Sequence, residues 1–235
     1  MINKNMSFFD HLDELRNRII KSILFIILFS IISYYYSALI IDILINPIKN
    51  YSINFQVLKI TSIFLIKIAI SIMSGILISF RFILYQSLQF LLPAFNLLTI
   101  KKIYFFTIIS FILFISGIIF GYRIIIPFSI TFFNSLSLGI EYINLNYTLD
   151  NYLFYLIWIL TISSFIFQLP FLIIIIIKVG LVDIKYLKNH RKHIIVSFFI
   201  FAAILTPPDP VSQVCVVLPL YLLFEISLLL SKIIK

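Results

Sequence analysis

Long apolar stretches separated by short polar segments are the main pattern of this chain. A membrane-spanning helix needs about 20 mostly apolar residues, and four stretches exceed that length. Two shorter apolar stretches follow, separated by a proline-rich turn, and we interpret them as a helical hairpin whose short first arm is accommodated by local thinning of the bilayer. The pattern predicts an all-α membrane protein with six transmembrane helices, the last two short, in a single membrane domain over residues 1–235. The predicted spans are residues 19–41, 62–84, 103–126, 152–177, 194–205 and 214–230.

The composition excludes a soluble protein. Of the 235 residues, 62% are hydrophobic and 11% are charged, and the mean hydropathy is +1.15. An ordinary soluble domain is about 45–50% apolar and about 25% charged, so this chain has too few charged side chains to cover a water-facing surface. The single cysteine, Cys215, rules out an intramolecular disulfide and a cysteine-based metal cluster.

The basic residues fall mostly on one side of the predicted membrane domain. We call the side of the amino terminus the cis side. If the spans alternate, 14 of the 18 lysines and arginines lie on cis segments. The positive-inside rule then places both termini in the cytoplasm or its organellar equivalent, and an even number of spans independently requires both termini on one side. The formal net charge of +9 therefore reports topology rather than a nucleic-acid partner.

Charged residues of both signs gather just ahead of the first apolar stretch, on a predicted amphipathic helix. Asp13 and Arg16 stand three apart and Glu14 and Arg18 four apart, so both pairs can form ion pairs on the helix surface. One interpretation is an interfacial anchor with solvated ion pairs, which are common and energetically small. The other is a carboxylate cluster at the membrane surface that grips a basic ligand.

A polar turn separates the last two apolar stretches. Its prolines, Pro207 and Pro208, stop one helix and, with Asp209, shape the start of the next. Thr206 and Gln213 flank this turn near the trans face. Either they satisfy backbone groups that the turn frees within the membrane, or they form a polar docking point for another transmembrane helix.

Glu225 lies in the interior of the sixth predicted span, and Gln168 lies within the fourth. An intramembrane ionisable residue is a functional-site hypothesis by default. No basic partner for Glu225 is evident inside a neighbouring span, so we expect it either to be protonated or to reach a watery cavity. The alternative for Glu225, and the better interpretation for Gln168, is a structural hydrogen bond between helices.

Motifs of enzymatic chemistry are missing from the sequence. There is no P-loop, no glycine-rich nucleotide fingerprint and no pattern of a catalytic triad. The three histidines, His11, His190 and His193, lie at cis edges rather than on facing span interiors, which argues against a haem site. We therefore predict a protein that binds neither a cofactor nor a metal.

Six short motifs, in order along most of the chain, resemble the TatC family, the multispanning subunit of the twin-arginine protein translocase. Together they make a coincidental match very improbable. The motifs are His11-Leu12-Asp13-Glu14-Leu15-Arg16-Asn17-Arg18, Leu84-Tyr85-Gln86 through Leu92-Pro93-Ala94-Phe95, Phe120-Gly121-Tyr122 through Pro127, Phe167-Gln168-Leu169-Pro170, Leu205-Thr206-Pro207-Pro208-Asp209-Pro210-Val211-Ser212-Gln213, and Pro219 through Phe224-Glu225.

This resemblance implies a receptor and not an enzyme, with a cis surface that binds the twin-arginine motif of signal peptides on folded cargo. By the family pattern Glu14 is a main contact, and Arg16, Gln86 and Phe90 line the recognition face. The edge formed by Thr206 and Gln213 resembles the docking site of single-span TatA/TatB-like partner subunits. The resemblance further implies a homo-oligomer within a receptor complex, contact with membrane lipid, and transport driven by the proton-motive force.

One departure from the family pattern bears on specificity. The family usually carries a second glutamate in the first cis loop, ahead of a basic pair, and here Thr99 or Ile100 stands at that place before Lys101 and Lys102. We therefore expect weaker discrimination between twin-arginine and twin-lysine peptides than in a relative with two glutamates, with Glu14, aided by Asp10 or Asp13, as the main contact.

Two other classes of protein compete with this interpretation. The first is an ion-coupled small-solute transporter with Glu225 as the coupling residue, although no internal repeat or paired broken helices are evident. The second is a structural subunit of a respiratory complex, which fits the codon bias but not the motif series. That bias, with 54 isoleucines and 13 lysines against 5 arginines and 5 alanines, indicates an A+T-rich genome such as that of an organelle. We expect a plastid thylakoid membrane, with the mitochondrial inner membrane or the bacterial plasma membrane as alternatives.

Overall fold

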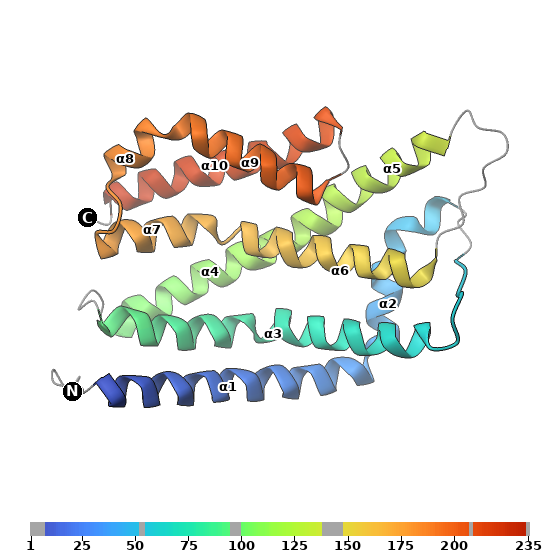
Figure 1. Cartoon of the computed structure of the whole chain (residues 1–235), viewed down its shortest axis with the longest axis horizontal. Helices are drawn as coiled ribbons and strands as arrows, with labels where there is room; N and C mark the ends of the chain where they lie inside the picture. Colours follow the sequence, from blue (N-terminus) through green and yellow to red (C-terminus); the bar gives the residue numbers. More distant parts are fainter. Residues whose placement is uncertain (1–7, 52–54, 95–99, 138–147, 207–208, 234–235) are drawn as a thin grey trace. The chain divides into compact units, whose positions relative to one another are not determined.

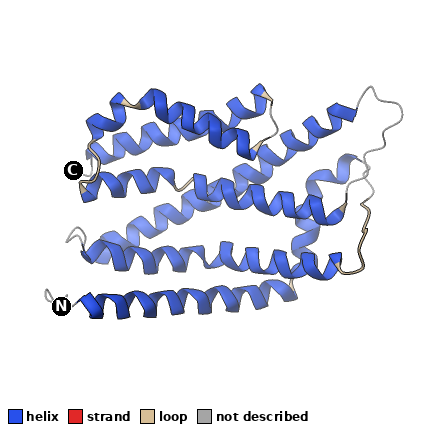
Figure 2. Ribbon diagram, viewed as in Figure 1, coloured by secondary structure: helices blue, strands red, loops and turns tan. Residues whose placement is uncertain are grey.

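The computed structural model describes residues 8–51, 55–94, 100–137, 148–206 and 209–233. Nearly all of these residues are helical and none lies in a β-strand (Figure 2). The α-helices are α1 (Phe8–Tyr35), α2 (Ser37–Ile45), α3 (Ser62–Ala94), α4 (Ile100–Phe120), α5 (Ile126–Ser137), α6 (Leu149–Ile166), α7 (Leu169–Val179), α8 (Ile184–Asn189), α9 (Arg191–Leu205) and α10 (Pro210–Ile233). A 3-10 helix, η1 (Asn46–Tyr51), follows α2, and a π-helical turn, η2 (Gly121–Ile125), joins α4 to α5.

Five helical stretches in the described part of the chain are long and apolar enough to cross a membrane. This confirms the predicted all-α membrane protein. The predicted fifth span, residues 194–205, lies in α9, which has 15 residues and is therefore about 22 Å long. The hydrocarbon core of a bilayer is about 30 Å thick, so α9 is shorter than the other five stretches. The five stretches are Leu12–Tyr35, Ser62–Phe90, Tyr104–Ser135, Leu149–Ile177 and Pro210–Ser231.

The ends of the first and third predicted spans differ from the structure. Helix α1 ends at Tyr35, and a turn at Tyr36 separates it from α2, so residues 19–41 are not one helix. Tyrosine and serine are weaker helix formers than leucine, and they cluster here as Tyr34-Tyr35-Tyr36-Ser37. The segments 42–61 and 127–150, which the predicted spans leave between helices, hold the end of α2, η1 and almost all of α5.

A wide turn carries the third helical stretch past a proline. The π-helical turn η2 directly precedes Pro127, which is the second residue of α5. Proline has no N–H and its ring clashes with the carbonyl four residues earlier in a regular α-helix. The extra residue of a π-turn relieves that conflict, so Tyr104–Ser135 continues as one apolar stretch.

The fourth predicted span, residues 152–177, is interrupted near its middle. Helix α6 ends at Ile166 and α7 begins at Leu169, with Pro170 in the first turn of α7. The N–H of Gln168 donates to the carbonyl of Phe165 at 2.9 Å. This bond spans three residues instead of the four of an α-helix, so the turn is tighter. Proline supplies the reason for the break, because it cannot donate to the preceding turn.

The described chain separates into two compact units, one over Met1–Ile43 and Ile63–Ile112, the other over Leu44–Ser62 and Leu113–Lys235. In the first unit α1 and α3 run side by side (Figure 1). A Cβ added to Gly75 of α3 would lie 2.7 Å from the backbone nitrogen of Ser30 in α1. Glycine is therefore needed there for the helices to approach this closely. The rings of Phe25 and Phe82 stack across the same pair of helices with centroids 4.2 Å apart.

In the second unit α7, α9 and α10 pack together, and α6 packs on the π-turn η2 (Figure 1). A Cβ on Gly117 would lie 2.8 Å from both the carbonyl oxygen of Ser163 and the Cα of Ser164. The hydroxyl of Ser163 donates to the carbonyl of Gly117 at 2.9 Å. Near the start of α6, the hydroxyl of Tyr152 donates to the carbonyl of Leu44 at 3.2 Å. Whether both units form the single membrane domain predicted from the sequence stays a prediction.

Candidate functional site

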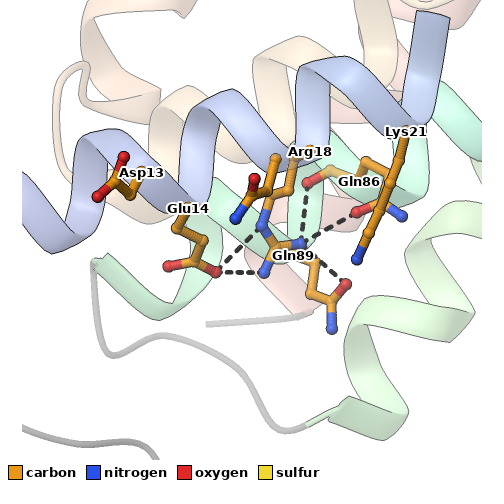
Figure 3. A pocket seen from close by; sticks show the side chains of 7 residues that line it. Asp13, Glu14, Arg18, Lys21, Gln86 and Gln89 are labelled. Atoms are coloured by element: carbon orange, nitrogen blue, oxygen red, sulfur yellow. Dashed lines mark hydrogen bonds and ion pairs between the residues drawn. The ribbon is translucent and has the colours of Figure 1, made fainter.

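A polar cleft lies between α1 and the last turns of α3, within the first unit. Its volume is about 480 Å³. In a chain this apolar, seven polar side chains around one hollow are unusual. The lining residues are Asp13, Glu14, Asn17, Arg18 and Lys21 from α1, and Gln86 and Gln89 from α3 (Figure 3).

Arg18 stands at the centre of the hydrogen bonds in this cleft (Figure 3). Its Nε donates to Oε1 of Glu14 at 3.0 Å, and its Nη2 forms an ion pair with the same oxygen. Its Nη1 donates to Oε1 of Gln89 at 2.8 Å and, at longer range, to Oε1 and the carbonyl oxygen of Gln86 at 3.3 and 3.4 Å. The Arg18 guanidinium thus pairs with a carboxylate of its own helix and links α1 to α3 through two glutamines of α3.

Helix geometry explains why these side chains meet. Glu14 and Arg18 are four residues apart on α1, and Gln86 and Gln89 are three apart on α3, so each pair lies on one helix face. The Arg18 side chain is only 15% exposed, and that of Glu14 is 31% exposed. The pair is therefore shielded from water more than an ordinary surface ion pair, which makes its charge-assisted hydrogen bonds stronger.

The lining charges balance. Asp13 and Glu14 supply two carboxylates, while Arg18 and Lys21 supply two cations. The lining charges therefore sum to zero, although the lining presents a carboxylate and amide oxygens in an arrangement that holds a guanidinium. Chemically, the site is suited to recognising a cation with several directed donors.

The residues that the sequence predicted for this site divide into two groups. Glu14 and Gln86 line the cleft. Arg16 lies outside the lining and pairs with Asp13 at 3.4 Å on an exposed face of α1, as the three-residue spacing predicts. Phe90 is half-buried on α3, one turn beyond Gln86, and is also outside the lining.

Arg18 and Gln89 are cleft residues that the predicted site did not include. Both carried a signal in the sequence. Arg18 was already predicted as the partner of Glu14, and Gln89 shares a helix face with Gln86. Thr99, where the second glutamate of the family is expected, lies outside the described residues, and the side chain of Ile100 is likewise not described.

A second polar cluster joins α9 to α10 and corrects one expectation. We expected no basic partner for Glu225, but Nη2 of Arg191 lies 2.9 Å from its Oε2. The hydroxyl of Tyr221 donates to the other oxygen, Oε1, also at 2.9 Å. No sequence pattern indicated this pair, because Arg191 precedes the apolar stretch of its helix and reaches Glu225 only when α9 and α10 fold back on each other.

Polar residues of the turn between α9 and α10 form hydrogen bonds with backbone groups at the ends of these two helices. The hydroxyl of Thr206 donates to the carbonyl of Ala202 at 2.9 Å, within its own helix end. Asp209 caps α10, since its Oδ2 accepts the backbone N–H of Ser212 at 2.8 Å and Pro210 occupies the first helical position. Pro207 and Pro208 lie outside the described residues.

Two predicted polar residues of the membrane interior differ in exposure. Gln168 is 5% exposed, at the break between α6 and α7. Gln213 is half-buried in the first turns of α10, and its side-chain amide has no hydrogen-bond partner among the described residues. The side chain of Gln168 is therefore shielded within the fold, whereas the side-chain amide of Gln213 can still bond to another group.

Proteins of a known family are similar to this chain in sequence and in fold. Residues 10–219 match the family described as Sec-independent protein translocase protein (TatC). The TatC of Carboxydothermus hydrogenoformans is 31% identical over the whole of this chain and 96% of its own length. A protein of Reclinomonas americana named as the TatC-like protein ymf16 is 36% identical over 98% of this chain and 89% of its own length.

Solved structures agree with the sequence comparison. A crystal structure described as the twin-arginine translocase receptor TatC in DDM has a TM-score of 0.81 and 31% identity, and it covers 94% of this chain and 99% of that one. The helical fold and these relatives define a multi-pass integral membrane protein of a protein-export system. The chain belongs to the TatC family and is a subunit of the twin-arginine translocase.

Proposed function

We propose that the chain is the receptor subunit of its translocase and binds twin-arginine signal peptides of folded precursors in the α1–α3 cleft. The observation that carries this proposal is the set of acceptors around Glu14, which already holds one guanidinium. Glu14 and the amide oxygens of Gln86 and Gln89 together accept from three nitrogens of Arg18. An arginine of a peptide presents the same donors in the same planar fork.

Arg16 and Phe90 are proposed as outer contacts of the same peptide. Arg16 is 68% exposed beside Asp13, and Phe90 lies one turn beyond Gln86 on α3. The first is placed to meet a polar or acidic group of the peptide. The second offers an aromatic surface to the apolar residues that follow a twin-arginine motif.

The membrane topology belongs to the same proposal. Six spans with both termini on the cis side put α8, with Lys185 and Lys188, on the same side as the cleft. The 14 cis basic residues support this orientation. Helix α9 counts as the short fifth span because it packs along α10, and thinning of the bilayer would accommodate its length.

The proposed partners are single-span TatA/TatB-like subunits and further copies of this chain, with transport driven by the proton-motive force. Gln213 supports a docking role, because its amide can bond to a partner helix within the membrane. Thr206 supports it less, since its hydroxyl already donates to Ala202.

The proposed location is a thylakoid membrane, with a mitochondrial or bacterial inner membrane as the alternatives; the relatives reported above include bacterial forms.

The transporter alternative loses its main support in the structure. Its coupling residue, Glu225, forms an ion pair with Arg191 and accepts a hydrogen bond from Tyr221. A carboxylate engaged in this way is suited to joining α9 and α10.

Binding of a synthetic twin-arginine signal peptide to the purified full-length protein tests the proposal. We expect saturable binding to the wild type and a loss of at least about tenfold in affinity for Glu14→Gln, which removes a charge-assisted pair worth about 1.5–3 kcal/mol. The control Asp183→Asn removes a carboxylate before α8 and should bind normally. Equal binding by the wild type and Glu14→Gln would remove the cleft from consideration.

A further inference from the structure

The position that a ligand arginine would take in the cleft is already filled by the protein's own Arg18. This guanidinium engages Glu14 through Nε and Nη2, and Gln89 and Gln86 through Nη1. The same acceptors are the ones that the proposed function assigns to the signal peptide. A ligand cannot use them while Arg18 does.

We propose that Arg18 is an internal competitor that determines the specificity of the cleft for arginine over lysine. This inference rests on the proposed function. A peptide side chain must displace Arg18 from Glu14, so only a cation that restores the lost hydrogen bonds binds well. Arg18 itself then moves out of its 15% exposed position.

The two candidate ligand cations differ in what they restore. Arginine carries five N–H donors in a rigid plane and can serve a carboxylate and neighbouring amides at once. Lysine carries a compact charge with three donors, so some acceptors that Arg18 had satisfied would be left without a partner. A buried acceptor that loses its partner costs free energy. Displacement therefore penalises lysine more than arginine.

This competition would give a site with one glutamate a preference for arginine over lysine. Thr99 or Ile100 stands where relatives are expected to carry a second glutamate. A single exposed carboxylate attracts any cation, because charge alone distinguishes arginine from lysine poorly. With Arg18 in place, the Glu14 carboxylate instead releases Arg18 and accepts the arginine of the peptide.

Peptide binding to the Arg18→Gln variant tests this role. We expect the affinity for a twin-lysine peptide to rise about tenfold and that for a twin-arginine peptide about threefold, so that their ratio falls about threefold. Arg18→Lys should give an intermediate ratio, because it keeps the charge and loses the fork. The control Lys192→Gln, which removes an exposed cis charge on α9, should leave the ratio unchanged.

Other outcomes separate this inference from the proposed function. If Arg18→Gln weakens both peptides equally and lowers the thermal midpoint, Arg18 is only a brace between α1 and α3 and the inference is overturned. An unchanged ratio with normal stability overturns it as well. If the wild type binds neither peptide, or if Glu14→Gln binds like the wild type, the proposed function fails and this inference fails with it.

A different observation supports a second site, at Arg81 on α3. Its side chain is exposed, and no carboxylate among the described residues pairs with it. Its guanidinium lies 5.6 Å from the ring centroid of Phe111, and its Nη2 is 3.5 Å from the hydroxyl of Tyr104. The surrounding exposed side chains on α3 and α4 are apolar: Ile78, Phe82, Phe105 and Ile112.

We infer that Arg81 binds the phosphate of an anionic phospholipid in the cis leaflet. A cation on an apolar helix surface reaches toward the headgroups by extending its side chain. Arg81 precedes Gln86, a residue of the polar cleft, by five positions, which is about 7–8 Å along the helix axis. The guanidinium is therefore within reach of the headgroup level, and Tyr104 adds a hydroxyl beside the phosphate.

Native mass spectrometry of the delipidated full-length protein tests the lipid site. With phosphatidylglycerol we expect one more bound lipid on the wild type than on Arg81→Gln, and no such difference with phosphatidylcholine. The control Arg123→Gln, an exposed arginine of the π-turn, should behave as the wild type. Equal retention of phosphatidylglycerol by Arg81→Gln contradicts the inference, and so does displacement of the lipid by millimolar inorganic phosphate, which would indicate a site for the free ion.

Discussion

Glu225 lies inside an apolar helix, yet polar groups meet both of its carboxylate oxygens. Arg191 pairs with one oxygen and Tyr221 donates to the other. The Glu225 side chain is 26% exposed and that of Arg191 is 43% exposed, so the pair is partly screened and its contribution to stability is modest. Its main effect is to fix the register of α9 against α10.

A double-mutant cycle on this pair gives the first prediction. Arg191→Gln and Glu225→Gln should each lower the free energy of unfolding by about 1 kcal/mol, because each leaves the other group without its charged partner. The double variant should lose clearly less than the sum of the two. Thermal unfolding in detergent measures all four proteins, and strict additivity would show that the two side chains do not interact.

Residue chemistry was predictable where it is local along a helix. The spacing of Glu14 from Arg18 and of Asp13 from Arg16 sufficed to predict both ion pairs. The partners Gln86 and Gln89 of Arg18, and the partner Arg191 of Glu225, come from other helices. No periodicity in one sequence specifies which helix packs against which, so these contacts required the fold.

At the scale of elements, hydrophobic length predicted where helices exist but not where they bend. The isoleucine-rich stretches between 152 and 177 appear continuous in hydropathy, while the structure ends α6 at Ile166 and restarts at Leu169. Pro170 marks that break and Pro127 follows the π-turn. Hydropathy records burial in lipid, whereas the backbone hydrogen bonds that proline removes decide the helix boundaries.

Close packing of helices depends on particular small residues, which gives the second prediction. Gly117→Ala places a Cβ 2.8 Å from the backbone at Ser163 and Ser164, and should cost about 1–3 kcal/mol through overpacking. Resistance to heat and to protease in detergent measures the effect.

The matched control for this substitution lies two residues away. Ile119→Val changes a side chain that is exposed on the same helix, and the folded protein should tolerate it. A Gly117→Ala variant as resistant as Ile119→Val would mean that α4 and α6 can move apart without loss, contrary to the role of close approach between membrane helices.

At the scale of the whole molecule, the proposed topology supplies the third prediction. In a Cys215→Ser background, single cysteines replace the exposed Lys59, between η1 and α3, and the exposed Lys185 in α8. An impermeant maleimide added from the trans side of sealed vesicles should label the cysteine at position 59 at once. The cysteine at position 185 should react only after permeabilisation, because six spans and the charge bias place it on the cis side.

Labelling of both positions from the trans side would contradict the proposed topology, because it would require an even number of spans between them where three are proposed. The membrane class and the family pattern were accessible from the sequence because composition and ordered motifs extend over the whole chain. The number of crossings is harder to derive, since the 15 residues of α9 are too few for an ordinary span.

The pairing of Glu14 with Arg18 has a consequence for the effect of salt. A receptor with a vacant carboxylate gains an ion pair when a cationic peptide binds, so its affinity falls as ionic strength rises. In this cleft the incoming arginine takes over an ion pair that already exists, and the number of pairs is conserved. Recognition of the peptide should then be nearly indifferent to ionic strength, even though it depends on charged groups throughout.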